Sequence, residues 1–244
     1  MLLIWPVAFL IGVVLGSFGA GGGMITVPAL IYFADMPVKE AVAMSLWIVA
    51  LVSIVALFQN KAWRSLQLKL LVTLGVSGVI GSVSGSMLAH YLSEKVQLGL
   101  FTLLIVLVTW WVSKMDLSDR VGVFRFIPAA GAGFFIGILT GIFGVGGGFL
   151  LVPALIYLGM HHFPTAVAHS LVLIALNALA GGLSHLSQVT ISIEQTLGFA
   201  IIASAGTVLG VYILKHVDNN KLQKSFSLIL ILLGVFMAWR TITL

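Results

Sequence analysis

Hydrophobic residues run through this chain in long stretches, and polar residues gather in the short intervals between them. The apolar segments lie at 2–33, 41–58, 70–92, 96–113, 126–158, 166–184, 196–214 and 225–242. Continuous runs of this length are typical of membrane-spanning helices, whereas a membrane β-barrel would alternate apolar and polar residues. A helix that spans a bilayer needs about 20 residues. Six of the segments therefore predict one crossing each.

The two remaining segments, 2–33 and 126–158, are too long for one straight crossing and contain the same motif. Residues 12–32 read GVVLGSFGAGGGMITVPALIY, and residues 137–157 read GILTGIFGVGGGFLLVPALIY. Three consecutive glycines interrupt each copy, and glycine costs about 1 kcal/mol per residue in a helix. The triplets therefore predict breaks in the helices. Non-helical backbone at membrane depth persists only where it is buried in protein or lines a cavity.

The two motif copies are 125 residues apart, and the same offset relates residues outside the motif. Matching pairs include Ser45 with Ser170, Gly81 with Gly206, Gly85 with Gly210 and Phe101 with Phe226. The chain is therefore expected to consist of two homologous transmembrane repeats, at 1–120 and 121–244. The expected fold class is an all-α membrane protein in which each repeat has four apolar segments and opens with a Gly-rich break.

Two topologies fit this pattern. In one, each motif segment is a broken helix that crosses the membrane, so each repeat crosses four times and the repeats are parallel. In the other, each motif segment is a re-entrant hairpin of two half-helices that meet at the glycines, so each repeat crosses three times and the repeats are inverted.

Basic residues help to choose between the topologies, because cytoplasmic loops carry an excess of Lys and Arg. The crossing topology divides the 12 basic residues 7 to 5 between the two sides. The hairpin topology places 9 of the 12 on one side and leaves only Lys39, Lys95 and Arg240 on the other. We therefore favour the inverted hairpin topology, with both termini outside.

Composition supports an integral membrane protein and limits the chemistry available to it. The chain of 244 residues is 60% hydrophobic and only 8% charged, and its mean hydropathy is +1.19. We expect no soluble domain and, because the first residues are not basic, no cleaved signal peptide. The chain has no cysteine, which excludes disulfides and thiolate metal sites. No metal, cofactor or nucleic-acid partner is expected.

The glycine breaks are the first candidates for a binding site. The helix that resumes after each triplet, near Met24 and Phe149, begins with unpaired N–H groups and a positive dipole end, which together attract anions. Breaks at matching positions of two halves are typical of transporter binding sites. An alternative is that the glycines only allow close helix packing. The predicted substrate-binding glycines are Gly21, Gly22, Gly23, Gly146, Gly147 and Gly148.

Four polar residues within the apolar segments complete the candidate site: Ser45, Ser170, His169 and Asn177. Polar groups at membrane depth tend to face a cavity or the bundle interior. For the serines and the asparagine, the alternative is interhelical hydrogen bonding. For the histidine, whose matching position is Met44, the alternative is a buried, neutral, hydrogen-bonded ring.

An enzyme is not expected. All seven acidic residues lie at or near the ends of segments, which disfavours proton coupling through a buried carboxylate. His169 and Ser170 are neighbours in sequence, and neighbours on a helix do not face each other, so they do not form a nucleophile–base pair.

The doubled pattern G-x(3)-G-x(2)-G-x-G-G-G-x(3)-V-P-A-L resembles the sulfite exporter TauE/SafE family of membrane permeases, and the resemblance covers the whole chain. It implies a multi-spanning transporter of the bacterial inner membrane. It also implies small sulfur-containing anions, such as sulfite or an organosulfonate like sulfoacetate, as substrates.

The expected function is alternating access around a midplane site formed by the two glycine breaks. The expected partners are a small anion and the lipid bilayer, and a homodimer is the expected assembly. Two alternatives stay open: a passive anion channel on the same scaffold, and a membrane subunit that does not transport.

Overall fold

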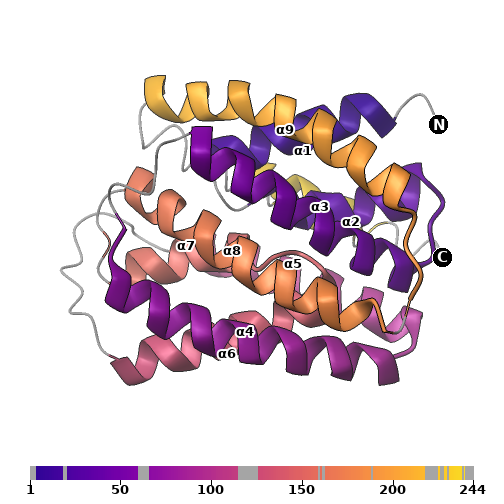
Figure 1. The fold of residues 1–244 in the computed structure, drawn as a ribbon, viewed down its shortest axis with the longest axis horizontal. Coiled ribbons are helices and arrows are strands. Elements are labelled where there is room, and N and C mark those ends of the chain that lie inside the picture. Colours follow the sequence, from indigo (N-terminus) through magenta and orange to yellow (C-terminus); the bar gives the residue numbers. More distant parts are fainter. Residues whose placement is uncertain are drawn as a thin grey trace.

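The computed structural model of the chain is a bundle of long helices (Figure 1). It describes residues 4–18, 21–59, 66–114, 126–158, 160, 163–187, 189–217, 225, 228, 229, 231–237 and 239. In this part, the helices with defined bounds are α1 (Ile4–Phe18), α2 (Gly21–Phe33), α3 (Val38–Gln59), α4 (Leu68–Tyr91), α5 (Glu94–Lys114), α6 (Phe126–Phe143), α7 (Gly148–Tyr157), α8 (Phe163–His185) and α9 (Ile193–His216).

Five helices among the described residues are long and apolar enough to cross a membrane: α3, α4, α6, α9 and Pro164–His185 of α8. This confirms the predicted all-helical membrane fold class. The second helices of the two motif segments are shorter, with 13 residues in α2 and 10 in α7. At 1.5 Å per residue they reach only about 20 Å and 15 Å. Neither is long enough to span a bilayer by itself. Helix α2 already begins at Gly21 and includes its whole glycine triplet, and α7 begins at the third glycine, so the predicted starts near Met24 and Phe149 are wrong.

Helices α1, α3 and α9 run in the same direction. Gly12 of α1 lies against Ala203 of α9, and Gly16, one turn later, lies against Thr207. The Thr207 hydroxyl also donates a hydrogen bond of 2.7 Å to Gln59 at the end of α3. Since α1 and α3 run the same way, the chain must reverse between them.

Helix α2 makes this reversal, so α1 and α2 form a hairpin. Trp5, at the start of α1, and Phe33, at the end of α2, line the same cavity at one end of the bundle. Gly22, at the start of α2, lies against the Leu15 side chain near the end of α1. The N-terminal glycine triplet is therefore at the tip of a hairpin, as the favoured topology predicts.

The second half has the same arrangement. Gly137 and Gly141 of α6 lie against Gly78 and Ser82 of α4, so α4 and α6 are parallel. The chain then turns back, because a Cβ placed on Gly147 would lie 2.5 Å from the Thr140 hydroxyl and 2.7 Å from Ile136, which is four residues further back along α6. Helices α6 and α7 therefore form a second hairpin.

The two hairpins enter the bundle from opposite ends. Helix α8 runs parallel to α4, because Ser82 of α4 donates to the Asn177 carbonyl while Ser86, further along α4, donates to Ser184. It runs antiparallel to α3, since Gly146 meets both Val49 and Ile174 while Leu46 lies beside Gly181. The described helices therefore have the inverted hairpin arrangement and not that of broken crossing helices in parallel halves, while the homology of the two halves stays a prediction.

Helix bounds and contacts recur at the predicted offset of 125. Helix α4 spans 68–91 and α9 spans 193–216, and 193 − 68 and 216 − 91 both equal 125. The contact of Gly12 with Ala203 matches that of Gly137 with Gly78. Each hairpin therefore packs on a helix of the other half. The division of the chain at residue 120 stays a prediction.

The closest packing is between backbones. A Cβ placed on Gly12, Gly137 or Gly85 would lie closer than 3.0 Å to a backbone carbonyl oxygen of the neighbouring helix. Small residues allow such approach in membrane proteins, where association depends on van der Waals contact. The glycines of α1, α4, α6 and α9 that face a neighbouring helix therefore serve close helix packing, which was the alternative to a binding role.

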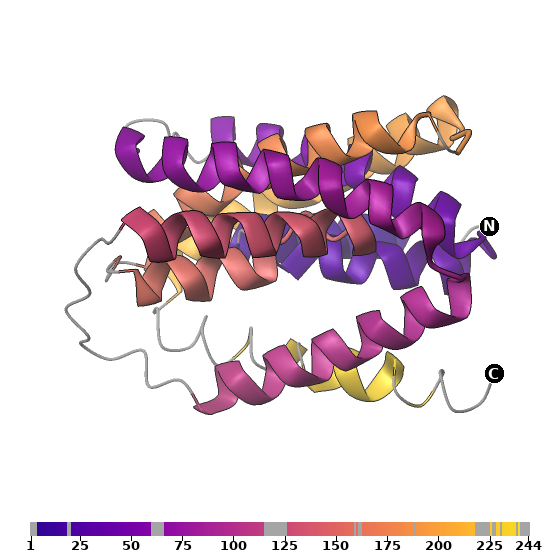
Figure 2. The ribbon, with the colours of Figure 1, turned by 90° about the horizontal axis from the view of Figure 1, so that it is seen from below.

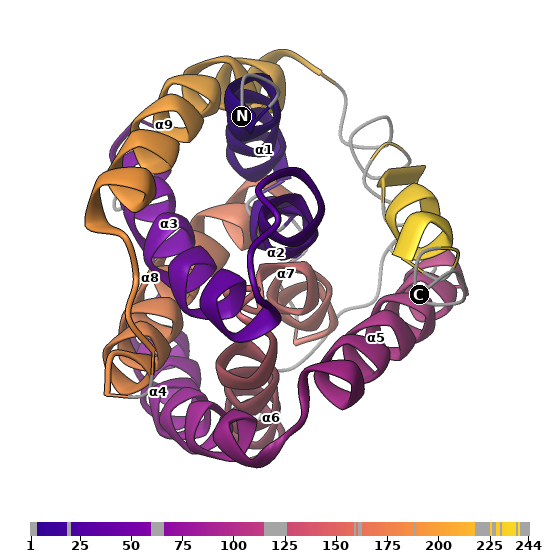
Figure 3. The ribbon, with the colours of Figure 1, turned by 90° about the vertical axis from the view of Figure 1, so that its right-hand side faces the viewer.

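Seen along the helices, α2 and α7 lie at the centre of the bundle with α1, α3, α8 and α6 around them (Figure 3). Helix α5 and the helical residues 231–237 lie together along one side (Figure 2). Phe101 of α5 stacks on Phe143 of α6 with ring centroids 5.6 Å apart. The short hairpin helices are therefore the most interior elements.

Replacing Gly12 or Gly137 by alanine should destabilise the protein by about 1–3 kcal/mol, the usual cost of overpacking. Gly131→Ala is the matched control, because nothing lies within 4 Å of its Cβ position, and it should stabilise α6 by up to about 1 kcal/mol. Thermal unfolding in detergent measures both effects. Equal melting temperatures for Gly137→Ala and Gly131→Ala would contradict the packing.

Single cysteines introduced into this cysteine-free chain test the topology. Lys95 and Glu194 begin α5 and α9 at one end of the bundle, whereas Lys69 and Lys215 lie at the other. A membrane-impermeant thiol reagent should label the cysteines at 95 and 194 from one side and those at 69 and 215 from the other. Labelling of the cysteines at 95 and 194 from opposite sides, which the topology with crossing motif segments requires, would disprove the hairpin topology.

Candidate functional site

The second glycine break is a buried turn that only glycines adopt readily. Gly144, Gly146 and Gly147 have φ angles of +73°, +65° and +69°, and L side chains are strained in this region. Residues 141–149 are all buried. Helix α7 begins at Gly148, and its N-cap, Gly147, has no side chain to cap the first N–H groups.

The second break meets the start of α2 at the centre of the bundle. A Cβ placed on Gly23, in the first turn of α2, would collide with the Val145 carbonyl oxygen. A Cβ on Gly146 would lie 2.7 Å from Val49 and 2.9 Å from Ile174, which lie near the middle of α3 and α8. From this junction α2 and α7 run toward opposite ends, so their N-terminal dipole ends face one another.

Donors from several elements satisfy the carbonyl groups where α6 ends. The last turn of a helix leaves its carbonyls without partners inside the helix. Here the donors and carbonyl acceptors are Gly144 N–H to Thr140 at 2.9 Å, His185 Nε2 to Gly141 at 2.9 Å, Gln97 Nε2 to Ile142, and Ser45 Oγ to Gly144 at 2.7 Å. Side chains of α3, α5 and α8 therefore hold the break in place.

Ser45 is fully buried and belongs to the break itself. Besides its bond to Gly144, its hydroxyl contacts the Val42 carbonyl at 2.8 Å. Ser170 is equally buried and donates to the Val167 carbonyl at 2.8 Å, which matches the contact of Ser45 with the Val42 carbonyl. The match of Gly144 in the first half is Gly19, which lies outside the described residues.

Asn177 brings an unsatisfied amide close to the break. It is only 1% exposed, and neither Oδ1 nor Nδ2 has a hydrogen-bond partner. A buried unpaired polar group costs about 1–3 kcal/mol. The side chain lies against Gly78 of α4 and is three residues from Ile174, which touches the break. Of the predicted residues, it has the most unused hydrogen-bonding capacity.

His169 is placed differently from the other predicted residues. Its Nε2 accepts a 2.8 Å hydrogen bond from the Gln67 N–H, and its Nδ1 donates to the Thr165 carbonyl at 2.8 Å. Both nitrogens are occupied and the ring is neutral. Gln67 is the N-cap of α4, so the ring secures the start of α4, and the structure does not bring it to the glycine breaks.

Sequence reasoning missed Gln97 and His185, which hold the end of α6. Both are buried, at 1% and 3% exposed. Gln97 is the first strongly polar residue of the segment 96–113, and His185 directly follows the segment 166–184. These positions suggest residues at a membrane boundary, and only the fold turns them toward the carbonyls of α6.

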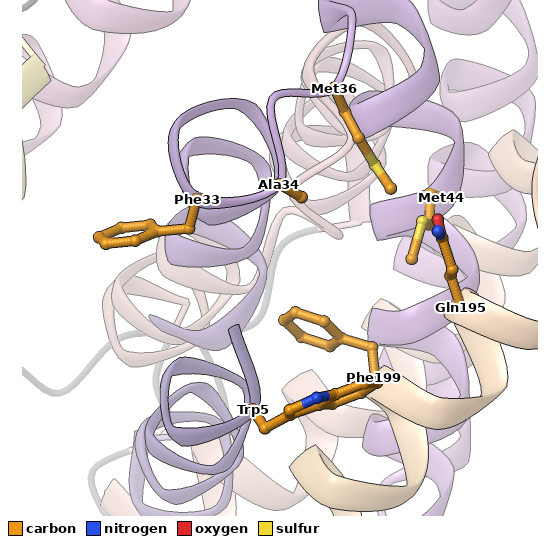
Figure 4. Close-up of a pocket in the computed structure, with 7 residues that line it drawn as sticks. All are labelled: Trp5, Phe33, Ala34, Met36, Met44, Gln195 and Phe199. Carbon is orange, nitrogen blue, oxygen red and sulfur yellow. The ribbon is translucent and has the colours of Figure 1, made fainter. Parts of the chain in front are cut away.

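A cavity of about 130 Å³ lies where the open end of the α1–α2 hairpin meets α3 and α9 (Figure 4). Its lining residues are Trp5, Phe33, Ala34, Met36, Met44, Gln195 and Phe199. Gln195 is the one polar side chain among them. The position that matches Met44 is His169, whose ring is hydrogen-bonded. The two halves therefore differ at equivalent places.

The centre of the bundle carries no formal charge in the part that the structure describes. The buried polar side chains there are Ser, Thr, Gln, Asn and His, with no Asp, Glu, Lys or Arg among them. An anion at the junction of the breaks would meet helix dipoles and backbone N–H groups instead of a buried cation.

Comparison with known proteins agrees with this architecture. The profile of the family described as "Sulfite exporter TauE/SafE" matches residues 4–237. A "probable membrane transporter protein" of Methanocaldococcus jannaschii is 29% identical, with 95% of this chain and 92% of the relative aligned. One of Bacillus subtilis is 27% identical, with 91% and 92% aligned.

A "probable membrane transporter protein" of Xylella fastidiosa is also 27% identical, over 95% of this chain and 92% of the relative. No solved structure matches the fold. The helical membrane bundle, the doubled glycine breaks and the family match over almost the whole chain agree, and the protein belongs to the sulfite exporter TauE/SafE family of membrane transporters.

Proposed function

We propose that this transporter moves a small sulfur-containing anion, sulfite or an organosulfonate, which binds where the two glycine breaks meet. The observation that carries the proposal is the junction of Gly23 with Val145, from which the N-terminal ends of α2 and α7 diverge. Two buried positive dipole ends at one point favour an anion. The family's description supplies the substrate class.

The hydrogen-bonding groups at the junction favour weak and reversible anion binding, which transport requires, over tight binding. A sulfonate or sulfite group spreads its negative charge over three oxygens, and backbone N–H groups at helix starts can each donate to one of them. Conduction and transport need binding that is weak enough for release. Ser45 and Asn177 supply the nearest side-chain hydrogen-bonding groups. We assign them supporting contacts, with Ser170 in the matching position of the other half.

The junction is closed in this conformation. Cβ positions at Gly22, Gly23, Gly146 and Gly147 all lie within 3.0 Å of neighbouring atoms. Binding therefore requires the hairpins to move apart, and inverted halves provide two equivalent ways of doing so. Alternating access is the mechanism that we propose, with each hairpin opening toward its own end of the bundle.

Purified protein in liposomes should transport sulfite or sulfoacetate saturably in a panel that also contains taurine, sulfate, acetate and chloride. Gly147→Ala should reduce this flux at least about tenfold, because a side chain at a φ of +69° is strained by about 1–2 kcal/mol and collides with the Thr140 hydroxyl. Gly131→Ala is the control. Thermal unfolding shows whether each variant is folded.

Three results would count against this proposal. Unsaturable chloride flux would indicate a channel on the same scaffold. Absence of flux for every anion from folded protein would indicate another substrate class or a role without transport. Normal sulfite flux in folded Gly147→Ala would remove the break from the binding site.

Replacing Ser45 by alanine tests the link between the break and α3. The change removes the donor to the Gly144 carbonyl and leaves a buried acceptor unpaired, which costs about 1–3 kcal/mol. We expect flux to fall several-fold and the melting temperature to drop by a few degrees. Ser84→Ala is the matched control, since Ser84 is exposed and bonds only to Ile80 of its own helix. Equal flux in both variants would show that Ser45 is dispensable.

A further inference from the structure

A small polar cavity lies at one end of the bundle, next to the end of α6. Its volume is about 100 Å³, and its lining residues are Lys39, Ala89, His90, Gln97, His185 and Val189. They come from α3, α4, α5, α8 and the segment that follows α8. In composition it contrasts with the cavity at the α1–α2 hairpin, which is almost entirely apolar.

The cavity is connected to the second glycine break by hydrogen bonds. Two of its lining side chains, His185 and Gln97, donate to the Gly141 and Ile142 carbonyls. These carbonyls lie within three residues of Gly144, where the break begins. A ligand in the cavity would therefore touch the side chains that hold the break.

The Lys39 side chain brings an ammonium group to this cavity. The Lys39 ammonium group is 3.1 Å from the His90 carbonyl oxygen, which it uses as an acceptor. The titratable groups that line the cavity are Lys39, His90 and His185, and no carboxylate is among the lining residues. The cavity therefore attracts a negative charge.

The cavity lining also includes an acceptor without a donor. His185 donates through Nε2, so its Nδ1 is an acceptor, and this nitrogen makes no hydrogen bond to a described residue. Gln97 Oε1 has no hydrogen-bond partner either, but it is too deeply buried to be reached from the cavity. A plain anion would leave Nδ1 unpaired. A monoanion that carries one O–H donor matches both the Lys39 ammonium group and this nitrogen.

The residues of this cavity are not repeated at the offset of 125. The residues 125 positions away from Lys39, Gln97 and His185 are Pro164, Leu222 and Asn60. The ammonium group, the amide and the imidazole therefore have no equivalents of the same type at the matching positions. Such an asymmetry suits a role at one side of the membrane only.

We propose that this cavity is a second binding station for the transported anion, selective for a monoanionic oxyanion with an O–H group, of which hydrogen sulfite is the simplest. Lys39 binds the charge, and His185 Nδ1 accepts from the O–H group. This inference rests on the proposed function, because it makes the station the access point to the glycine junction from the Lys39 end.

Imidazole NMR signals of the full chain in detergent, with ¹⁵N-labelled histidine, test the station. Sulfite is titrated under mildly acidic conditions in which hydrogen sulfite predominates, and methanesulfonate serves as a monoanion without an O–H donor. The signals of His185 and His90, assigned with H185Q and H90Q, should shift with sulfite and much less with methanesulfonate. Those of His169 and His216, at the other end of the bundle, should not shift.

K39Q should weaken the apparent sulfite affinity in this titration about three- to fivefold, the range for one partly exposed charge. K95Q is the matched control, because Lys95 is exposed at the same end and does not line the cavity. Equal shifts with both anions would overturn the O–H selectivity. No shift with sulfite, or equal affinity in K39Q and K95Q, would overturn the station.

Flux separates failure of the station from failure of the proposed function. Normal sulfite flux in K39Q together with loss of sulfite flux in Gly147→Ala would support the central site and overturn the station. Sulfite-induced shifts at His185 in a protein that transports no sulfur anion would instead contradict the proposed function and reduce the cavity to an anion site of another kind.

Discussion

The end of α6 inside the bundle is the constraint on which the rest of the structure depends. A helix that stops inside protein leaves the carbonyl groups of its last turn without partners in the helix. Ser45, Gln97 and His185 supply the donors, one from each of three helices. Their positions require α3, α5 and α8 to converge on this point. The glycine turn that follows can then adopt its left-handed conformation in a rigid surrounding.

The second organising feature is the exchange of hairpins between the halves. The α1–α2 hairpin packs on α9, and the α6–α7 hairpin packs on α4, with glycine against carbonyl at each contact. Backbones that touch at this distance cannot slide without separating. Each hairpin and its partner helix are therefore closely packed, and each such pair combines elements of both halves.

The ends of the bundle differ although the halves match. At the Lys39 end there are an apolar cavity around Met44 and a polar cavity around His185. The residue that matches Met44 is His169, and its ring is hydrogen-bonded to the start of α4. Symmetry of the scaffold thus places the central junction, and departures from symmetry distinguish the two ends.

Three features followed from the sequence by itself: a helical membrane protein, the breaks and the favoured hairpin topology. They follow from the lengths of the apolar runs, the doubled motif and the loop charges, because these features depend on hydrophobicity and on glycine's local conformational freedom. The positions of Ser45 and Asn177 within apolar segments also predicted that they face the interior. Only the tertiary structure decided what they touch: that Ser45 holds Gly144, that Asn177 is unpaired beside Gly78, and that His169 turns to Gln67. Gln97 and His185 were missed because hydrogen-bond partners distant in sequence depend on how helices pack, which no local pattern records.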